Sequence, residues 1–73
     1  MRVRTLHVVI YREGDGFVAQ CLNVDVASEG DTEQEARDKI REALELFFDE
    51  PVRDTDFATV GEAHVEELTL KSA

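Results

Sequence analysis

Residues 30–48 read G-D-T-E-Q-E-A-R-D-K-I-R-E-A-L-E-L-F-F, and this stretch decides the fold because it sets where a helix begins. The Thr32 hydroxyl can accept a hydrogen bond from the amide of Glu35, and the Glu35 carboxylate can accept one from the amide of Thr32. Pro51 ends the helix by residue 49 or 50. The pattern therefore predicts a helix over residues 33–49, with Thr32 and Glu35 as its cap.

The predicted helix is amphipathic. Apolar residues recur four, seven, eight and eleven positions after the first one and form a single stripe. The stripe consists of Ala36, Ile40, Ala43, Leu44 and Phe47. On the polar side, the charges allow two supporting i, i+4 pairs. These pairs are Glu33 with Arg37 and Glu35 with Lys39.

Three strands are predicted before the helix, because residues 3–12, 17–22 and 24–29 alternate in polarity or are rich in β-branched and aromatic types. The loop Glu13-Gly14-Asp15-Gly16 makes a hairpin of the first two, since its glycines can adopt positive φ. A four-residue loop pairs Arg12 with Phe17. It also places Ile10 beside Ala19 and Val8 beside Cys21 on one face.

The two faces of this sheet differ in composition. The face expected to cover the core carries Val8, Ile10, Ala19, Cys21, Val24 and Val26. The other face carries Val9, Tyr11, Val18, Gln20 and Leu22. We therefore expect the helix to pack on the first face and to leave the second one for water or a partner.

A last strand is expected over residues 62–70. Ala63 and Val65 suggest one register for it, and Leu68 and Leu70 suggest the other, so its face stays open. A right-handed crossover would place this strand parallel to the first. The predicted fold is a single α+β domain over residues 1–73, of β-β-β-α-β type. Its four-stranded mixed sheet has the order 3-2-1-4, with one helix on one face.

Size and charge restrict the function. Seventy-three residues form one domain with a thin core, which self-association would support, so we expect a homo-oligomer, most simply a dimer. The net charge of -9, from 17 acidic and 8 basic residues, repels phosphate backbones and disfavours direct nucleic-acid binding. The same charge favours a basic protein partner, or serves solubility alone.

Cysteine content and hydropathy bear on location. Cys21 is alone, so it forms no internal disulfide and belongs to no cysteine set for zinc. The apolar alternation at residues 6–11 is far shorter than the roughly 20 residues of a membrane span and lacks a signal-peptide pattern. We therefore expect a cytoplasmic protein without a membrane association.

No catalytic motif is recognised. A metal-dependent nuclease needs convergent carboxylates, normally one on the first strand, and residues 1–12 contain none. The acidic residues that follow residue 14 and precede the helix fall at turns and strand ends, where acidic side chains are commonly solvated. They are Asp15, Asp25, Glu29 and Asp31. His7 and Cys21 point to opposite faces, so we expect no enzyme activity, no cofactor and no metal site.

The apolar residues that remain outside the core are candidates for a partner or oligomer surface. On the second sheet face these are Val9, Tyr11 and Val18, and on the helix they are Leu46 and Phe48. Leu46 and Phe48 widen the apolar stripe beyond what one small sheet covers. They are expected to meet a second subunit or the loop that follows the helix.

Residues 11–50 resemble the HicB-like antitoxin domain. The characteristic parts are Gly16-Phe17, the strands within residues 18–28, Gly30-Asp31-Thr32 with Glu35-Ala36, and the helical segment 42–46. The resemblance implies a partial ribonuclease H-like fold without nuclease activity. It also implies a role in covering a small basic RNA-cleaving toxin, HicA.

Complete HicB antitoxins usually carry a C-terminal DNA-binding domain, whereas this sequence ends at Ala73, just after the last expected strand. The resemblance therefore does not extend to repression of an operon. Two alternatives stay open: a stand-alone self-assembling structural or regulatory subunit, and a small metal-dependent hydrolase or nuclease remnant.

Overall fold

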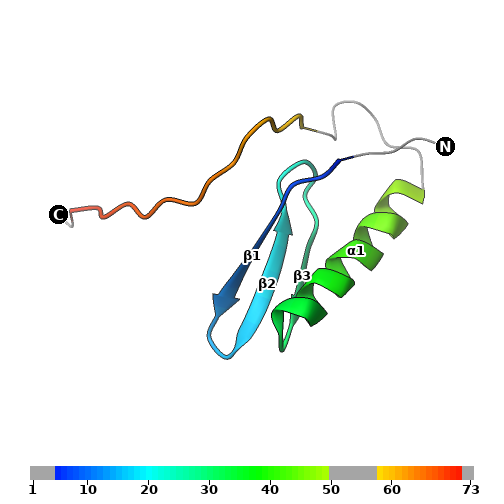
Figure 1. Ribbon diagram of the computed structural model, residues 1–73, viewed down its shortest axis with the longest axis horizontal. Helices are drawn as coiled ribbons and strands as arrows, with labels where there is room; N and C mark the ends of the chain where they lie inside the picture. Colours follow the sequence, from blue (N-terminus) through cyan, green and yellow to red (C-terminus); the bar gives the residue numbers. More distant parts are fainter. Residues whose placement is uncertain (1–4, 50–57, 72–73) are drawn as a thin grey trace.

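The computed structural model describes residues 5–49 and 58–71, which form a small α+β domain with one helix packed on one face of a sheet (Figure 1). The strands are β1 (Val8–Glu13), β2 (Gly16–Cys21) and β3 (Ala27–Gly30), and the helix is α1 (Glu33–Asp49). Residues 3 and 4 of the expected first strand, and Pro51, lie outside the described residues.

The hairpin of β1 and β2 confirms the predicted register. Arg12 pairs with Phe17, and its guanidinium carbon lies 5.4 Å from the centre of the Phe17 ring. The pairing continues to Glu13 and Gly16, so the turn contains only Gly14 and Asp15. Gly14 has a φ of 62°, in the left-handed region that a glycine adopts without strain. The hairpin is therefore one residue pair longer than the predicted one.

The third strand is shorter than predicted, because it covers Ala27–Gly30 and not residues 24–29. Val24 is buried within the turn before it, where its carbonyl accepts a hydrogen bond from Val26 N at 2.9 Å. At the other end of β3, a Cβ on Gly30 would lie 2.6 Å from the nitrogen of Ala36. At Gly30 the chain therefore passes so close to the helix that follows that no side chain fits without a shift.

The helix occupies the predicted residues, Glu33–Asp49. Its first turn is capped as expected by Thr32, whose Oγ1 accepts from Glu35 N at 3.0 Å. The Glu35 carboxylate instead lies 3.1 Å from Lys39 Nζ, which confirms that i, i+4 pair and leaves the second half of the capping box unmade. Arg37 donates to Gln34 Oε1 at 2.9 Å instead of pairing with Glu33.

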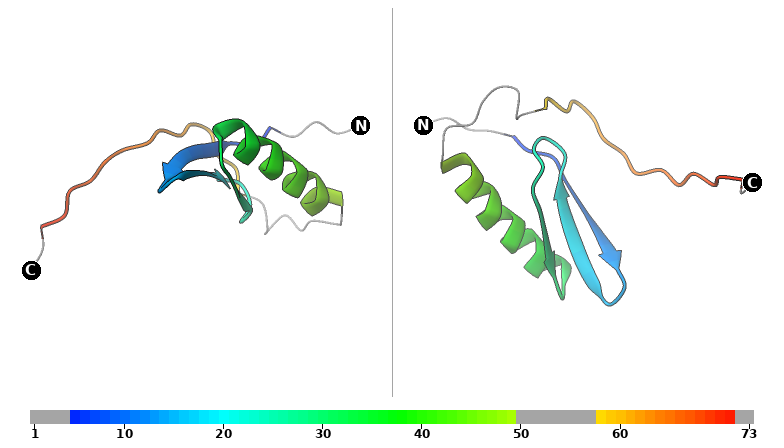
Figure 2. Two further views of the ribbon diagram at one scale, coloured as in Figure 1. Left: turned by 90° about the horizontal axis from the view of Figure 1, so that it is seen from below. Right: turned by 180° about the vertical axis from the view of Figure 1, so that it is seen from behind.

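The core lies between α1 and the sheet face that was expected to cover it. Its buried apolar residues are Ala19, Cys21 and Val24 from the sheet side, and Ala36, Ile40 and Leu44 from the helix. The helix packs against β3 and β2 and touches β1 least (Figure 2). The core is consequently closed on the β3 side and open on the β1 side, where Val8 and Ile10 are only half-buried.

The predicted fourth strand is wrong. Residues 58–71 contain no strand and extend away from the sheet on the side of β1 (Figure 1). Val65, Leu68 and Leu70 are 78%, 80% and 86% exposed. Among the residues that the structure describes, the sheet is therefore antiparallel throughout, with three strands in the order β1-β2-β3. The four-stranded mixed sheet of order 3-2-1-4, and the partial ribonuclease H-like architecture based on it, do not hold.

The sequence of this segment explains the difference. Ordering a residue in a strand costs about 1–2 kcal/mol of backbone entropy, which burial of side chains must offset. Val65 falls on one face of an extended chain, and Leu68 and Leu70 fall on the other. Neither face is apolar along its whole length, so pairing in the predicted parallel direction, beside its own β1, gains little.

Asn23 holds the start of this segment to the sheet. Asn23 is 4% exposed, and its side chain donates from Nδ2 to the carbonyl of Ala58 at 2.7 Å. The amide of Ala58 donates in return to the Asn23 carbonyl at 2.7 Å. Asn23 Oδ1 also accepts from the amide of His7 at 2.8 Å. One side chain thereby joins the start of β1, the β2–β3 turn and the segment after the helix.

Candidate functional site

The first candidate surface is the outer sheet face, which we define as Val9, Tyr11 and Val18. Tyr11 lies directly opposite Val18 on β2. Val9 lies on the same face, because alternate side chains of a strand point to the same side of the sheet. Tyr11 is 44% exposed, whereas the two valines are half-buried. Glu29 of β3 pairs with Val18 and adds a carboxylate to the border. The helix lies on the opposite face of the sheet (Figure 2).

The predicted residues of the helix do not join this surface. Leu46 is 68% exposed on α1, in the other layer of the molecule. Phe48 packs against the core and meets Phe47 edge to face, with ring centres 5.1 Å apart. The five predicted surface residues therefore belong to at least two separate surfaces.

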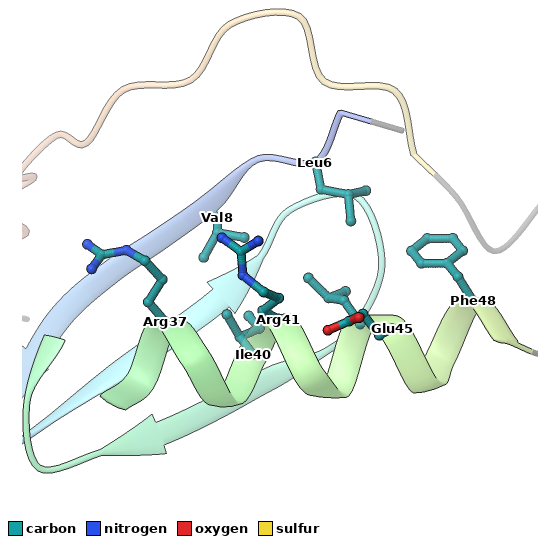
Figure 3. Close-up of a pocket in the computed structure, with 8 residues that line it drawn as sticks. Leu6, Val8, Arg37, Ile40, Arg41, Glu45 and Phe48 are labelled. Carbon is teal, nitrogen blue, oxygen red and sulfur yellow. The ribbon is translucent and has the colours of Figure 1, made fainter. Parts of the chain in front are cut away.

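The second candidate surface was not predicted. It is a groove of about 720 Å³ between α1 and β1, which we call the flank groove (Figure 3). It exists because the helix is displaced toward β3 and leaves the helix side of β1 partly uncovered. The groove is lined by Leu6, Val8, Arg37, Ile40, Arg41, Leu44, Glu45 and Phe48.

The flank groove changes character along its length. Arg37 and Arg41 lie on the half of α1 that is nearer to the β1–β2 turn, and Leu6 and Phe48 lie at the other end (Figure 3). Glu45 stands on the rim between Arg41 and Phe48. One end is therefore basic and the other apolar. The sequence indicated a helix over a sheet, but no residue pattern fixed the sideways position of that helix.

Beside the groove lies the free edge of β1. The amide of Leu22 donates to the carbonyl of His7 at 2.9 Å, so the backbone of His7 points toward β2. Backbone groups alternate in direction along an antiparallel strand, and those of Val8 and Ile10 consequently point away from β2. Within residues 5–49 and 58–71, no strand pairs with this edge.

Polar chemistry is sparse by comparison. In the part of the chain that the structure describes, no three histidine, cysteine or acidic side chains gather as metal ligands would. His7 Nδ1 is covered by protein and has no hydrogen-bond partner in that part. Cys21 is buried in the core. The fold presents three candidate contact surfaces: the outer sheet face, the flank groove and the free edge of β1.

Comparison of the chain with protein-family models, with curated proteins and with solved structures finds no match. The resemblance to HicB-like antitoxins therefore depends on residues 11–50 alone. Among the described residues, no helix combines the length and the apolar character that crossing a bilayer requires.

Proposed function

We propose that this protein is a non-catalytic binding module of the HicB-antitoxin kind, which covers a small basic RNA-cleaving toxin in the cytoplasm. The observation that supports the proposal is the outer sheet face. It presents Tyr11 beside Val18 on the side of the sheet opposite the helix, in a chain with a net charge of -9. Exposed apolar residues within a charged surface are typical of protein interfaces.

Charge and apolar contact have different roles in such a complex. The acidic surface attracts a basic partner and speeds its encounter. Tyrosine at the centre of an interface commonly anchors it, and loss of an anchor mainly speeds dissociation. Because salt screens exposed charges beyond about 8–10 Å, raising the salt concentration should slow association more than it speeds dissociation.

The test is to search the genomic neighbourhood of this chain for a small basic protein, and to measure its binding to this chain and the rescue of cell growth on co-expression. Tyr11→Ala should weaken the complex by about 2 kcal/mol or more, roughly 30-fold, mostly through faster dissociation. Leu46→Ala is the matched control, because Leu46 is an exposed apolar residue in the other layer. The proposal fails if no basic protein binds and growth is not rescued.

A self-assembling structural or regulatory subunit is the second candidate. The free edge of β1 and the flank groove favour it, because both are unfilled within the described residues and both suit another copy of the chain. This candidate would be supported over the antitoxin if the purified protein formed a defined oligomer and no other protein were recovered with it in a pull-down.

A further inference from the structure

Two described features complement each other: the free edge of β1, and an extended segment with exposed apolar side chains at residues 62–70. We propose that two copies of this chain exchange these segments. Residues 62–70 of one copy pair antiparallel with the β1 edge of the other, and Leu68 and Leu70 enter its flank groove. The inference does not depend on the antitoxin proposal, and it makes the self-assembly of the second candidate specific.

The edge of β1 is suited to a further strand. The backbone N–H and C=O groups of Val8 and Ile10 point outward, while the side chains of both residues point to the helix side of the sheet. A strand added there would make backbone hydrogen bonds with the edge. Every second side chain of that strand would face the flank groove.

The extended segment has one side that fits the groove. His64, Glu66, Leu68 and Leu70 alternate along it and share a face when the chain is extended. His64 Nε2 lies 2.6 Å from Glu66 Oε1, which places these two side chains together. This side is therefore polar and acidic at its start and apolar at its end.

The pattern of the groove selects the antiparallel direction. In that direction Glu66 lies toward Arg37 and Arg41, at the basic end of the groove. The two leucines then lie toward Leu6 and Phe48, at the apolar end. In the parallel direction Glu66 would move away from the arginines and toward Glu45, which lies between Arg41 and Phe48, and like charges would meet.

The length of the extended segment also fits the length of the flank groove. Four steps of extended chain, from Glu66 to Leu70, span about 13 Å. The groove residues Arg41 and Phe48 are seven helical steps apart, which is about 10 Å along the axis. The segment is thus long enough to reach from the basic end to the apolar end.

The antiparallel direction requires a second copy. Ala58 is held by Asn23, beside His7, at the end where β1 begins. A chain that left this point and followed its own β1 would run parallel to it. In the structure the segment instead leaves on the β1 side (Figure 1), where a neighbouring copy can receive it.

The first experiment measures the mass of the purified full chain in solution. Light scattering during gel filtration should give twice the chain mass of 8.2 kDa at tens of micromolar protein. The double variant Leu68→Asp, Leu70→Asp should be monomeric and still folded. Thr69→Asp, on the opposite side of the segment, should remain dimeric. A monomeric parent protein, or a dimer that survives the double substitution, would overturn the proposal.

A second experiment tests direction and register. Glu66→Lys should weaken the dimer about two- to fivefold, since it replaces an exposed ion pair by repulsion from Arg37 and Arg41. Glu67→Lys makes the same change of charge on the opposite side and should have a smaller effect. Hydrogen exchange should show slowed amides at Val8 and Ile10 in the dimer. Equal effects of the two lysine variants, or fast exchange at both amides, would contradict the antiparallel exchange.

Discussion

Asn23→Ala should destabilise the domain far more than its place in a turn suggests. The substitution removes the Oδ1 acceptor of the His7 amide and the Nδ2 donor to the Ala58 carbonyl, at 2.8 Å and 2.7 Å. The backbone bond from Ala58 N to the Asn23 carbonyl is retained in principle. The variant therefore separates the contribution of the Asn23 side chain to the stability of the domain from the contribution of the backbone turn.

The magnitude follows from the surroundings of each group. His7 is half-buried, and leaving its amide without an acceptor costs about 1–3 kcal/mol. Ala58 is exposed, so water replaces the lost donor and the cost there is about 0.5–1 kcal/mol. The sum is about 1.5–4 kcal/mol. In a domain of this size each kcal/mol lowers the Tm by about 4–8 °C.

Thermal and urea unfolding of Asn23→Ala and the parent protein, at one fixed protein concentration, measure this loss. Asp25→Ala is the control, because Asp25 is an exposed residue of the same turn and should change stability by less than about 0.5 kcal/mol. An Asn23→Ala protein as stable as the Asp25→Ala protein would falsify the assignment of Asn23 as the link between the three segments.

Two further predictions concern the passage from β3 into the helix. Gly30→Ala should destabilise by about 1–3 kcal/mol in urea unfolding, because its methyl group would lie 2.6 Å from Ala36 N. Gly61→Ala meets open space and should be nearly neutral, so equal stabilities would contradict the close approach. Thr32→Ala should lose about 1 kcal/mol and Thr32→Ser little, since serine keeps the capping oxygen. Equal losses in the two Thr32 variants would show that the hydroxyl is not the cause.

The helix and the first hairpin could be predicted because their determinants are local. Thr32 supplies the cap, and the stripe through Ile40 sets the buried face. In the hairpin, Gly14 and Gly16 indicated a short turn, and the short turn set the pairing of Arg12 with Phe17. Each of these elements depends on residues only a few positions apart, where sequence patterns are most informative.

The absence of the last strand and the presence of the flank groove could not be predicted, because both depend on packing between elements that are far apart in the sequence. The strand prediction for residues 62–70 assumed that the β1 edge would attract them, although Leu68 and Val65 fall on different sides of the segment. The groove depends on where α1 settles across the sheet. That position depends on how the helix packs on the buried side chains of the sheet, which the period of the helix does not encode.

The buried thiol of Cys21 gives this molecule an internal reporter. It is the single cysteine of the chain, is 2% exposed, and lies on β2 within the core beneath α1. A reagent that modifies thiols can reach it only when the helix and the sheet separate. The labelling rate, compared with that of a free thiol, would therefore report the free energy of this opening under native conditions. No probe has to be introduced for this measurement.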